Sequence, residues 1–120
     1  MSRTSAKRAT KPAAKSALRP AAKKGAKVAN KATSKAAKPP PVYSQAVLAA
    51  GLVFVSGTAP HDPLTGAIVG TTIQEQTRQC LSNISAILEA AGSSIDKIVS
   101  ITIVLADEDD FPGMNEEYIK

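Results

Sequence analysis

Few side chains in this 120-residue sequence could do chemistry by residue type alone, and they fall into three groups. Cys80 is the only cysteine and His61 the only histidine, so an internal disulfide and a cysteine–histidine zinc site are both excluded. Four consecutive acidic residues, beginning at Asp107, could bind a cation. The hypotheses that these residues raise are a nucleophilic thiol, a histidine general base and an acidic metal site.

Each group also has a structural interpretation, which its sequence context favours. Cys80 falls within an apolar stripe at helical spacing, where a thiol is usually buried and unreactive. His61 lies among turn-forming residues, where a histidine is usually solvated. The acidic run precedes a helical pattern, and carboxylates at a helix N-terminus interact favourably with the helix dipole. We therefore predict packing, solvation and helix capping respectively, with no cofactor and no metal site.

Charge divides the chain into two parts. Residues 1–41 contain 12 Lys or Arg and no Asp or Glu, whereas residues 42–120 contain 3 Lys or Arg and 10 Asp or Glu. The first part has too few large apolar side chains to offset the entropy lost on ordering. We expect a disordered basic extension over residues 1–41 and one domain over residues 42–120. No apolar run approaches the length of a membrane-spanning helix, about 20 residues, so no membrane partner is expected.

Three roles of the basic extension stay open. It could be a solvated tail, it could bind the phosphate backbone of RNA or DNA nonspecifically by counterion release, or it could direct the protein to an organelle. The extension lacks the apolar segment of a secretory signal. We therefore expect a cytoplasmic protein, with a mitochondrial or nuclear location as the alternatives.

Hydropathy patterns predict strands in the second part. Residues 43–50 and 52–57 are β-prone runs separated by Gly51, which predicts a hairpin, and the second run is apolar on both faces, as in an interior strand. Residues 98–105 are dense in β-branched side chains on both faces. This pattern predicts a central strand with neighbours on both sides.

Two helices are predicted among these strands. Thr72, followed three residues later by Glu75, forms a capping-box pattern, and the apolar stripe after it ends at Gly92. A second amphipathic pattern follows the acidic run and continues to Lys120, the last residue. Because the predicted central strand has few neighbours, we expect that another subunit or further C-terminal sequence completes the sheet.

Five ordered segments resemble the RidA family, also called YjgF or L-PSP: YSQAV, LVFVSG, DPLTGAIVG, IQEQTRQCLSNISAILEAAGSSIDKIV and DFPGMNEEY. They extend over nearly all of residues 42–120 in register. The resemblance implies a chorismate-mutase-like α+β fold, with a mixed sheet and two helices on one face, assembled as a homotrimer with ligand clefts between subunits. It also implies hydrolytic deamination of reactive 2-iminoacids, such as 2-iminobutanoate and 2-iminopropanoate, to 2-oxoacids and ammonia.

The resemblance also implies the residues of a site for this small imine. Tyr43 corresponds to the family's cleft tyrosine and is the candidate catalytic residue. The candidate substrate-binding residues are Ser56, Gly57 and Asn115. Ser56 and Gly57 correspond to the SG at the end of the second strand, and Asn115 corresponds to the asparagine that reaches a neighbouring cleft.

Some positions depart from the family pattern. Thr58 stands where a glutamine is expected, Pro41-Val42 replaces the Gly-Pro before the tyrosine, and the family has no catalytic histidine at the position of His61. The family's last two strands, which carry a carboxylate-binding arginine and a water-positioning glutamate, have no counterpart here.

The missing arginine bears on activity. Arg78 is predicted on the polar side of the first helix and cannot replace it, and no other residue in 42–120 offers an equivalent cation. We therefore expect a C-terminally truncated domain with impaired deaminase activity. The alternative function is noncatalytic RNA or DNA binding through residues 1–41.

Overall fold

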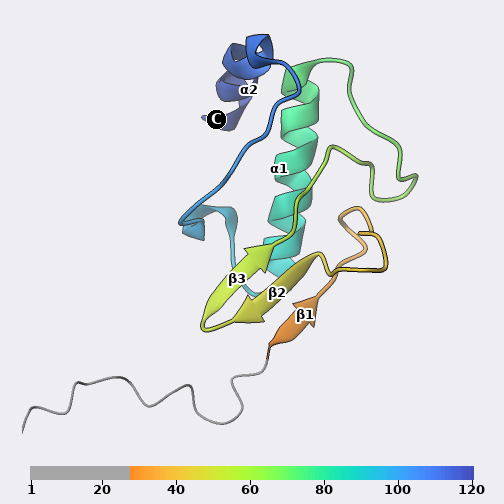
Figure 1. Cartoon of the computed structure of the whole chain (residues 1–120), viewed down its shortest axis with the longest axis vertical. Coiled ribbons are helices and arrows are strands. Elements are labelled where there is room, and N and C mark those ends of the chain that lie inside the picture. Colours follow the sequence, from red (N-terminus) through yellow and green to blue (C-terminus); the bar gives the residue numbers. More distant parts are fainter. Residues whose placement is uncertain (1–27) are drawn as a thin grey trace, which may run out of the picture.

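The computed structural model describes residues 28–120, and the part of the predicted disordered extension before residue 28 lies outside the described residues. The elements are β1 (Ala29–Lys31), β2 (Ala46–Ala49), β3 (Leu52–Val55), α1 (Ile73–Ala90) and α2 (Phe111–Tyr118), with short 3-10 turns η1 (Ile95–Lys97) and η2 (Glu108–Asp110). Figure 1 shows α2 beside the N-terminal half of α1 and the sheet near its C-terminal half. No helix within residues 28–120 is long and apolar enough to cross a membrane.

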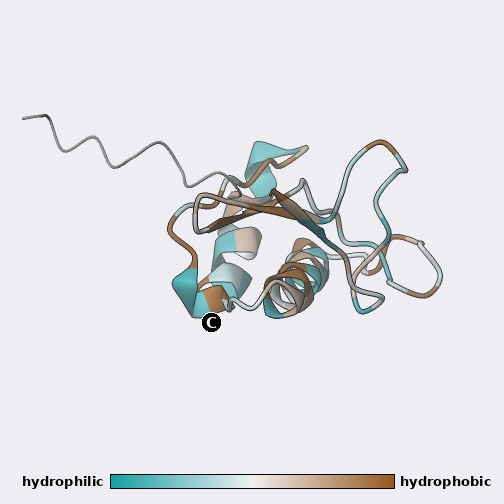
Figure 2. Cartoon of the chain, turned by 90° about the horizontal axis from the view of Figure 1, so that it is seen from below, coloured by the Kyte–Doolittle hydropathy of each residue, from teal (hydrophilic) through white to brown (hydrophobic). Residues whose placement is uncertain are grey.

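The predicted α+β class is confirmed, with an antiparallel sheet in the order β1-β2-β3. Figure 2 shows both helices on the same side of this sheet. The predicted hairpin is also confirmed, because β2 pairs with β3 and Val47 lies opposite Phe54. Its two turn residues, Ala50 and Gly51, have φ angles of 51° and 77°. Positive φ at both positions is the type I′ geometry that matches the twist of paired strands.

The core is small and lies between the sheet and α1. Ile87 of α1 and Ala46 of β2 are buried, and Val53 and Val55 of β3 pack against them. Alternate residues of β3 face the other way, and Leu52 and Phe54 remain about half exposed, at 50% and 55%. The helix therefore covers one face of the sheet.

Ordered structure begins before residue 42, where the domain was expected to start. Asn30 of β1 pairs with Val47 of β2, and Ala36 is 1% exposed. The apolar content of this segment did not indicate order, because main-chain hydrogen bonds rather than large side chains hold it. The side chain of Gln45 contributes four of them, to backbone groups of residues 33, 36 and 37.

Both ends of α1 follow the predicted pattern. The Thr72 side chain accepts from the Glu75 N–H at 3.2 Å, and the Glu75 carboxylate accepts from the Thr72 N–H at 3.3 Å, which completes the capping box. At the other end Gly92 has a φ of 79°, and the Ser93 N–H donates to the Leu88 carbonyl at 2.8 Å. This is the pattern of a Schellman motif, in which glycine ends a helix without steric cost.

The predicted central strand over residues 98–105 is not formed in the described part of the chain. The segment lies in no strand, and β3, which was expected to be interior, forms the edge of the sheet. Val99 and Val104 are each 88% exposed. A strand requires a ladder of hydrogen bonds to a neighbour, and none of the three described strands pairs with this segment. The described sheet is accordingly antiparallel rather than mixed.

Candidate functional site

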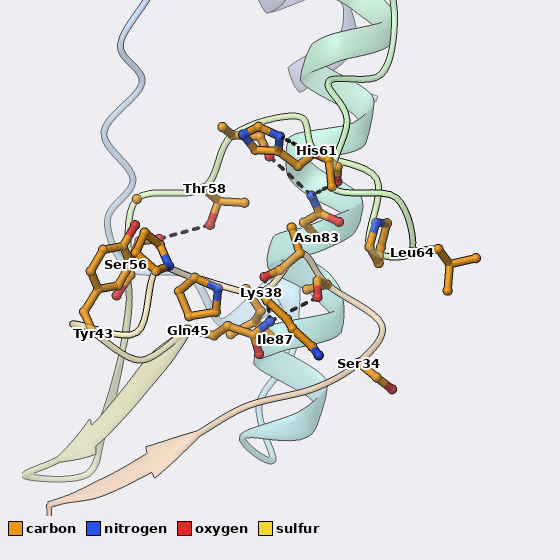
Figure 3. A pocket seen from close by; sticks show the side chains of 18 of the residues that line it. Ser34, Lys38, Tyr43, Gln45, Ser56, Thr58, His61, Leu64, Asn83 and Ile87 are labelled. Atoms are coloured by element: carbon orange, nitrogen blue, oxygen red, sulfur yellow. Dashed lines mark hydrogen bonds between the residues drawn. The ribbon is translucent and has the colours of Figure 1, made fainter.

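Three of the four predicted site residues line the same pocket, which has a volume of about 840 Å³. Tyr43 and Ser56 lie on the side of the β2–β3 hairpin, Gly57 follows directly, and His61 lies in the loop after it. The lining also includes Asn83 and Ile87 of α1 and residues of the segment before β2. Figure 3 shows these side chains around the pocket.

The hydroxyl groups of Ser56 and Thr58 donate hydrogen bonds to backbone carbonyls. The Ser56 hydroxyl donates to the Ser44 carbonyl at 2.6 Å, and the Thr58 hydroxyl donates to the Ser56 carbonyl at 3.0 Å. Because each hydroxyl uses its single proton in this way, each oxygen is left as an acceptor. A Cβ added at Gly57 would meet no atom within 4 Å, so the space beside its backbone is open.

Tyr43 stands at the rim of the pocket and is 48% exposed. Its backbone N–H donates to the Pro40 carbonyl at 3.3 Å, which fixes the turn that leads into β2. Within residues 28–120 its phenol makes no hydrogen bond, so the hydroxyl is free to donate and to accept.

His61 also lines this pocket, with its ring tied to the loop. The ring Nδ1 lies 2.9 Å from the Gly66 carbonyl oxygen, which can only accept, so Nδ1 donates its proton to this carbonyl. Its backbone forms an antiparallel bridge with Ile68. The Asp62 carboxylate accepts from the Thr65 and Leu64 N–H groups of the same loop, which lowers its pKa. The prediction of a simply solvated histidine therefore missed a specific hydrogen bond.

Two polar residues that support the site were not predicted. Asn83 is 1% exposed, and its side chain donates to the His61 carbonyl at 2.9 Å and to the Ala59 carbonyl at 3.3 Å. Gln45 is 4% exposed and holds the segment before β2. The signal in each case is an amide within an apolar pattern, which indicates a side chain that binds buried backbone groups.

Asn115, the fourth predicted site residue, does not line the pocket. It lies on α2, which is held on α1 by a bidentate ion pair between Arg78 and Glu117, at 2.7 and 3.0 Å. Hydrogen bonds from Arg78 and then Lys120 lower the pKa of Glu117 to about 2. Arg78 does not line the pocket, and its guanidinium is engaged between the helices.

Cys80 packs as predicted, whereas the acidic run caps the short turn η2 rather than α2, whose N-cap residue Asp110 makes no side-chain capping hydrogen bond. The Cys80 thiol is partly buried and lies 3.6 Å from the Thr58 carbonyl, and burial raises its pKa, which disfavours the nucleophilic thiolate. The Asp107 carboxylate accepts from the Asp109 N–H at 3.0 Å at the start of η2. Across residues 28–120, no three His, Cys, Asp or Glu side chains are grouped to hold a metal ion.

The Endoribonuclease L-PSP family model matches residues 33–120. The chain belongs to this family, also called RidA. A RutC family protein of Pyrococcus horikoshii is 51% identical over 83 residues, covering 69% of this chain and 66% of that protein. The 2-iminobutanoate/2-iminopropanoate deaminase of Capra hircus is 41% identical over 76 residues, covering 63% of this chain and 56% of the relative. The family match begins well before residue 42, in agreement with the ordered segment around Ala36.

Among solved structures, the YjgF gene product of Escherichia coli superposes with a TM-score of 0.72 at 35% identity. The match covers 76% of this chain and 71% of that one. The chain thus spans about two thirds of the length of the first curated relative and somewhat more of this solved chain. At this level of identity and superposition, the likeness extends from the sequence to the arrangement of the helices and strands.

Proposed function

We propose that this pocket catalyses the hydrolytic deamination of small 2-iminoacids, such as 2-iminobutanoate and 2-iminopropanoate. The observation that carries the proposal is the convergence of Tyr43, Ser56 and Gly57 on one pocket, although the three come from both ends of a hairpin. The names of two relatives support it: the Capra hircus deaminase and Reactive Intermediate Deaminase A of Arabidopsis thaliana, which is 45% identical over 78 residues.

The reaction requires few catalytic groups from the protein. Water adds to the C=N carbon of the imine, the carbon–nitrogen bond then breaks, and a 2-oxoacid and ammonia are released. A protonated imine is already electrophilic, so the pocket must mainly orient the substrate and one water molecule. The free Tyr43 hydroxyl can hold the water or the nitrogen, and the Ser56 oxygen can accept a hydrogen bond from the iminium N–H.

We expect a slow reaction in the 120-residue chain. Among the described residues that line the pocket there is no arginine, and the Arg78 guanidinium is engaged by Glu117. A bidentate guanidinium–carboxylate pair gives both affinity and orientation, so a pocket without one binds a 2-iminoacid less firmly.

A coupled assay tests the proposal. A dehydratase or an amino-acid oxidase generates 2-iminobutanoate, and the protein should increase the rate of its loss. Tyr43→Phe should lower that increment about twofold to tenfold, because a neutral hydrogen bond contributes about 0.5 to 1.5 kcal/mol. Tyr118→Phe, on α2 away from this pocket, is the matched control and should leave the rate unchanged. Loss of the imine at the uncatalysed rate in the presence of the unaltered chain would contradict the proposal.

We further propose a homotrimer in which Asn115 contributes to the cleft of a neighbouring subunit. What supports this assembly is the position of Asn115 on α2, outside the pocket of its own chain. Light scattering should then give three times the monomer mass, and Asn115→Ala should lower the deamination rate without dissociating the trimer. A monomeric protein whose deamination rate still falls in the Asn115→Ala variant would contradict the assembly.

A second candidate function is nonspecific RNA or DNA binding through residues 1–41. The observation that favours it is the charge of this segment, 12 cationic and no acidic residues, against an acidic remainder. Binding to single-stranded RNA should weaken steeply with salt. Replacement of the lysines in residues 1–27 by glutamine should abolish most of it. Equal binding by the two proteins across a salt series would exclude this function.

A further inference from the structure

The lining of the candidate pocket includes one lysine, Lys38. Among the described residues that line it, Lys38 is cationic, and no aspartate or glutamate is present. The other polar groups of the lining are neutral hydroxyls, amides and the His61 ring. Figure 3 shows Lys38 among the side chains around the pocket. A pocket with one cation and no acid favours an anionic ligand.

The backbone that carries Lys38 is held in place. The Gln45 amide nitrogen lies 3.1 Å from the Ala36 carbonyl and 2.8 Å from the Ala37 carbonyl, directly before Lys38. Pro39 follows, and its ring restricts the backbone φ angle on the other side. A lysine on a flexible tail would sample a large volume, whereas this one has a fixed origin at the pocket wall.

The charged groups near the pocket leave Lys38 without a competing carboxylate in the described residues. Asp62, in the neighbouring loop, uses its carboxylate for the N–H groups of Leu64 and Thr65. Glu117, on the far helix, pairs with Arg78 and Lys120. An incoming anion therefore does not have to displace a carboxylate of the protein.

From this geometry we infer that Lys38 binds the carboxylate of the ligand in this pocket. The substrate class, 2-iminoacids and their 2-oxoacid products, rests on the proposed function. A lysine ammonium is a point charge and cannot form the bidentate pair of an arginine. The resulting contact is weaker and more sensitive to salt, and it selects for a carboxylate without fixing the orientation of its plane.

Titration of the full 120-residue chain with 2-oxobutanoate, followed by NMR or calorimetry, tests the inference. Lys38→Gln should raise the Kd about twofold to fivefold at low ionic strength. Added salt should weaken binding to the unaltered protein and have little effect on the variant, because salt screens an exposed charge pair. Lys38→Arg should retain binding.

Two controls separate the charge of Lys38 from general effects. Lys35→Gln alters the same segment and the same charge, but Lys35 does not line the pocket, so its Kd should equal that of the unaltered protein. Butanone, which lacks the carboxylate, should bind the Lys38→Gln variant and the unaltered protein equally. Unfolding curves establish that both variants fold.

The outcomes distinguish this inference from the proposed function. Equal Kd values for Lys38→Gln and the unaltered protein, equal losses in the Lys38 and Lys35 variants, or no binding of 2-oxobutanoate at all would overturn the role of Lys38. Binding of 2-oxobutanoate that depends on Lys38, together with no deamination of 2-iminobutanoate, would overturn the proposed function and support the carboxylate site.

Discussion

In β1 and in residues 98–105, strand formation is the opposite of what the side chains predict. β1 reads Ala-Asn-Lys, has no β-branched side chain and comes from a basic segment, yet it pairs with β2. Residues 98–105 alternate β-branched side chains on both faces and are in no strand of the described sheet. The difference shows that β-propensity describes a side chain that fits a sheet, whereas a strand forms only where a backbone partner is present.

The difference between the two segments depends on where a neighbouring strand is available to pair with. β2 and β3 are joined by a two-residue turn, so each finds its partner locally, and β1 then adds to the free edge of β2. Residues 98–105 follow an 18-residue helix, and the edge of β3 that remains open is not bonded to them. Burial and pairing, rather than side-chain type, should therefore determine stability in the two regions.

The largest effect is expected where apolar side chains are buried behind the sheet. Ile87→Ala should lower the free energy of unfolding by about 3 kcal/mol, because it removes buried methyl groups and leaves a cavity. Ile87 is 3% exposed, whereas Val104, in the unpaired segment, is 88% exposed. Val104→Ala should therefore change stability by less than about 0.5 kcal/mol. Urea denaturation measures both, and a similar loss in the two variants would show that residues 98–105 are packed as firmly as the core.

A somewhat smaller loss is expected from the group that holds the segment after β1. Gln45→Ala should cost about 2 kcal/mol, since it leaves the backbone groups of residues 33, 36 and 37 without their partner. Hydrogen exchange at β1 should accelerate with it. Gln74→Ala is the matched control, because Gln74 makes only a 3.4 Å contact with Glu116 at the surface. Unchanged exchange at β1 in the Gln45 variant would mean that strand pairing alone orders this segment.

Acid should weaken the docking of α2 on α1. The pKa of Glu117 is about 2 in the folded protein, below its ordinary value of 4.5, because Arg78 and then Lys120 bind the carboxylate. A lowered pKa contributes stability that is present above about pH 4.5 and is lost as the pH falls through about 2. Arg78 is 61% exposed, so solvent limits the effect. In Glu117→Gln this part of the pH dependence should disappear from urea midpoints measured between pH 2 and pH 6, and a variant with the unaltered slope would assign it to other carboxylates.

The smallest effect is expected in the hairpin turn. Ala50 has a φ of 51°, where its Cβ is strained, and Ala50→Asn would produce the Asn-Gly pair that type I′ turns prefer. The variant should be more stable by about 0.5 kcal/mol. Gly51→Ala places a Cβ at a φ of 77° and should have the opposite sign, with a loss of about 1 kcal/mol. Thermal unfolding compares the two, and a loss of stability in both would indicate a turn of another type.

The local features were predictable from the sequence. The capping box at Thr72, the helix end at Gly92 and the hairpin at Gly51 each depend on residues within a few positions of one another, so a short pattern contains their physical cause. The two helices followed from hydrophobic spacing for the same reason, and the α+β class followed from the resemblance to the family. The predicted site residues Tyr43 and Ser56 were also placed in one pocket, because the hairpin that joins them is a local structure.

The remaining features depended on contacts between distant residues, and only the tertiary structure decided them. Pairing of β1 with β2 and the ion pair between Arg78 and Glu117 each join segments whose separation along the chain hides the contact. The same is true of Lys38. In the sequence it belongs to the basic extension, whereas in the structure Gln45 holds the adjacent backbone and Lys38 lines the pocket. Residues 98–105 lie in no strand of the described sheet, because no described strand pairs with them. A backbone group or an isolated charge gives the same signal in sequence whether its partner is water or protein. Only the folded chain brings the partner within bonding distance.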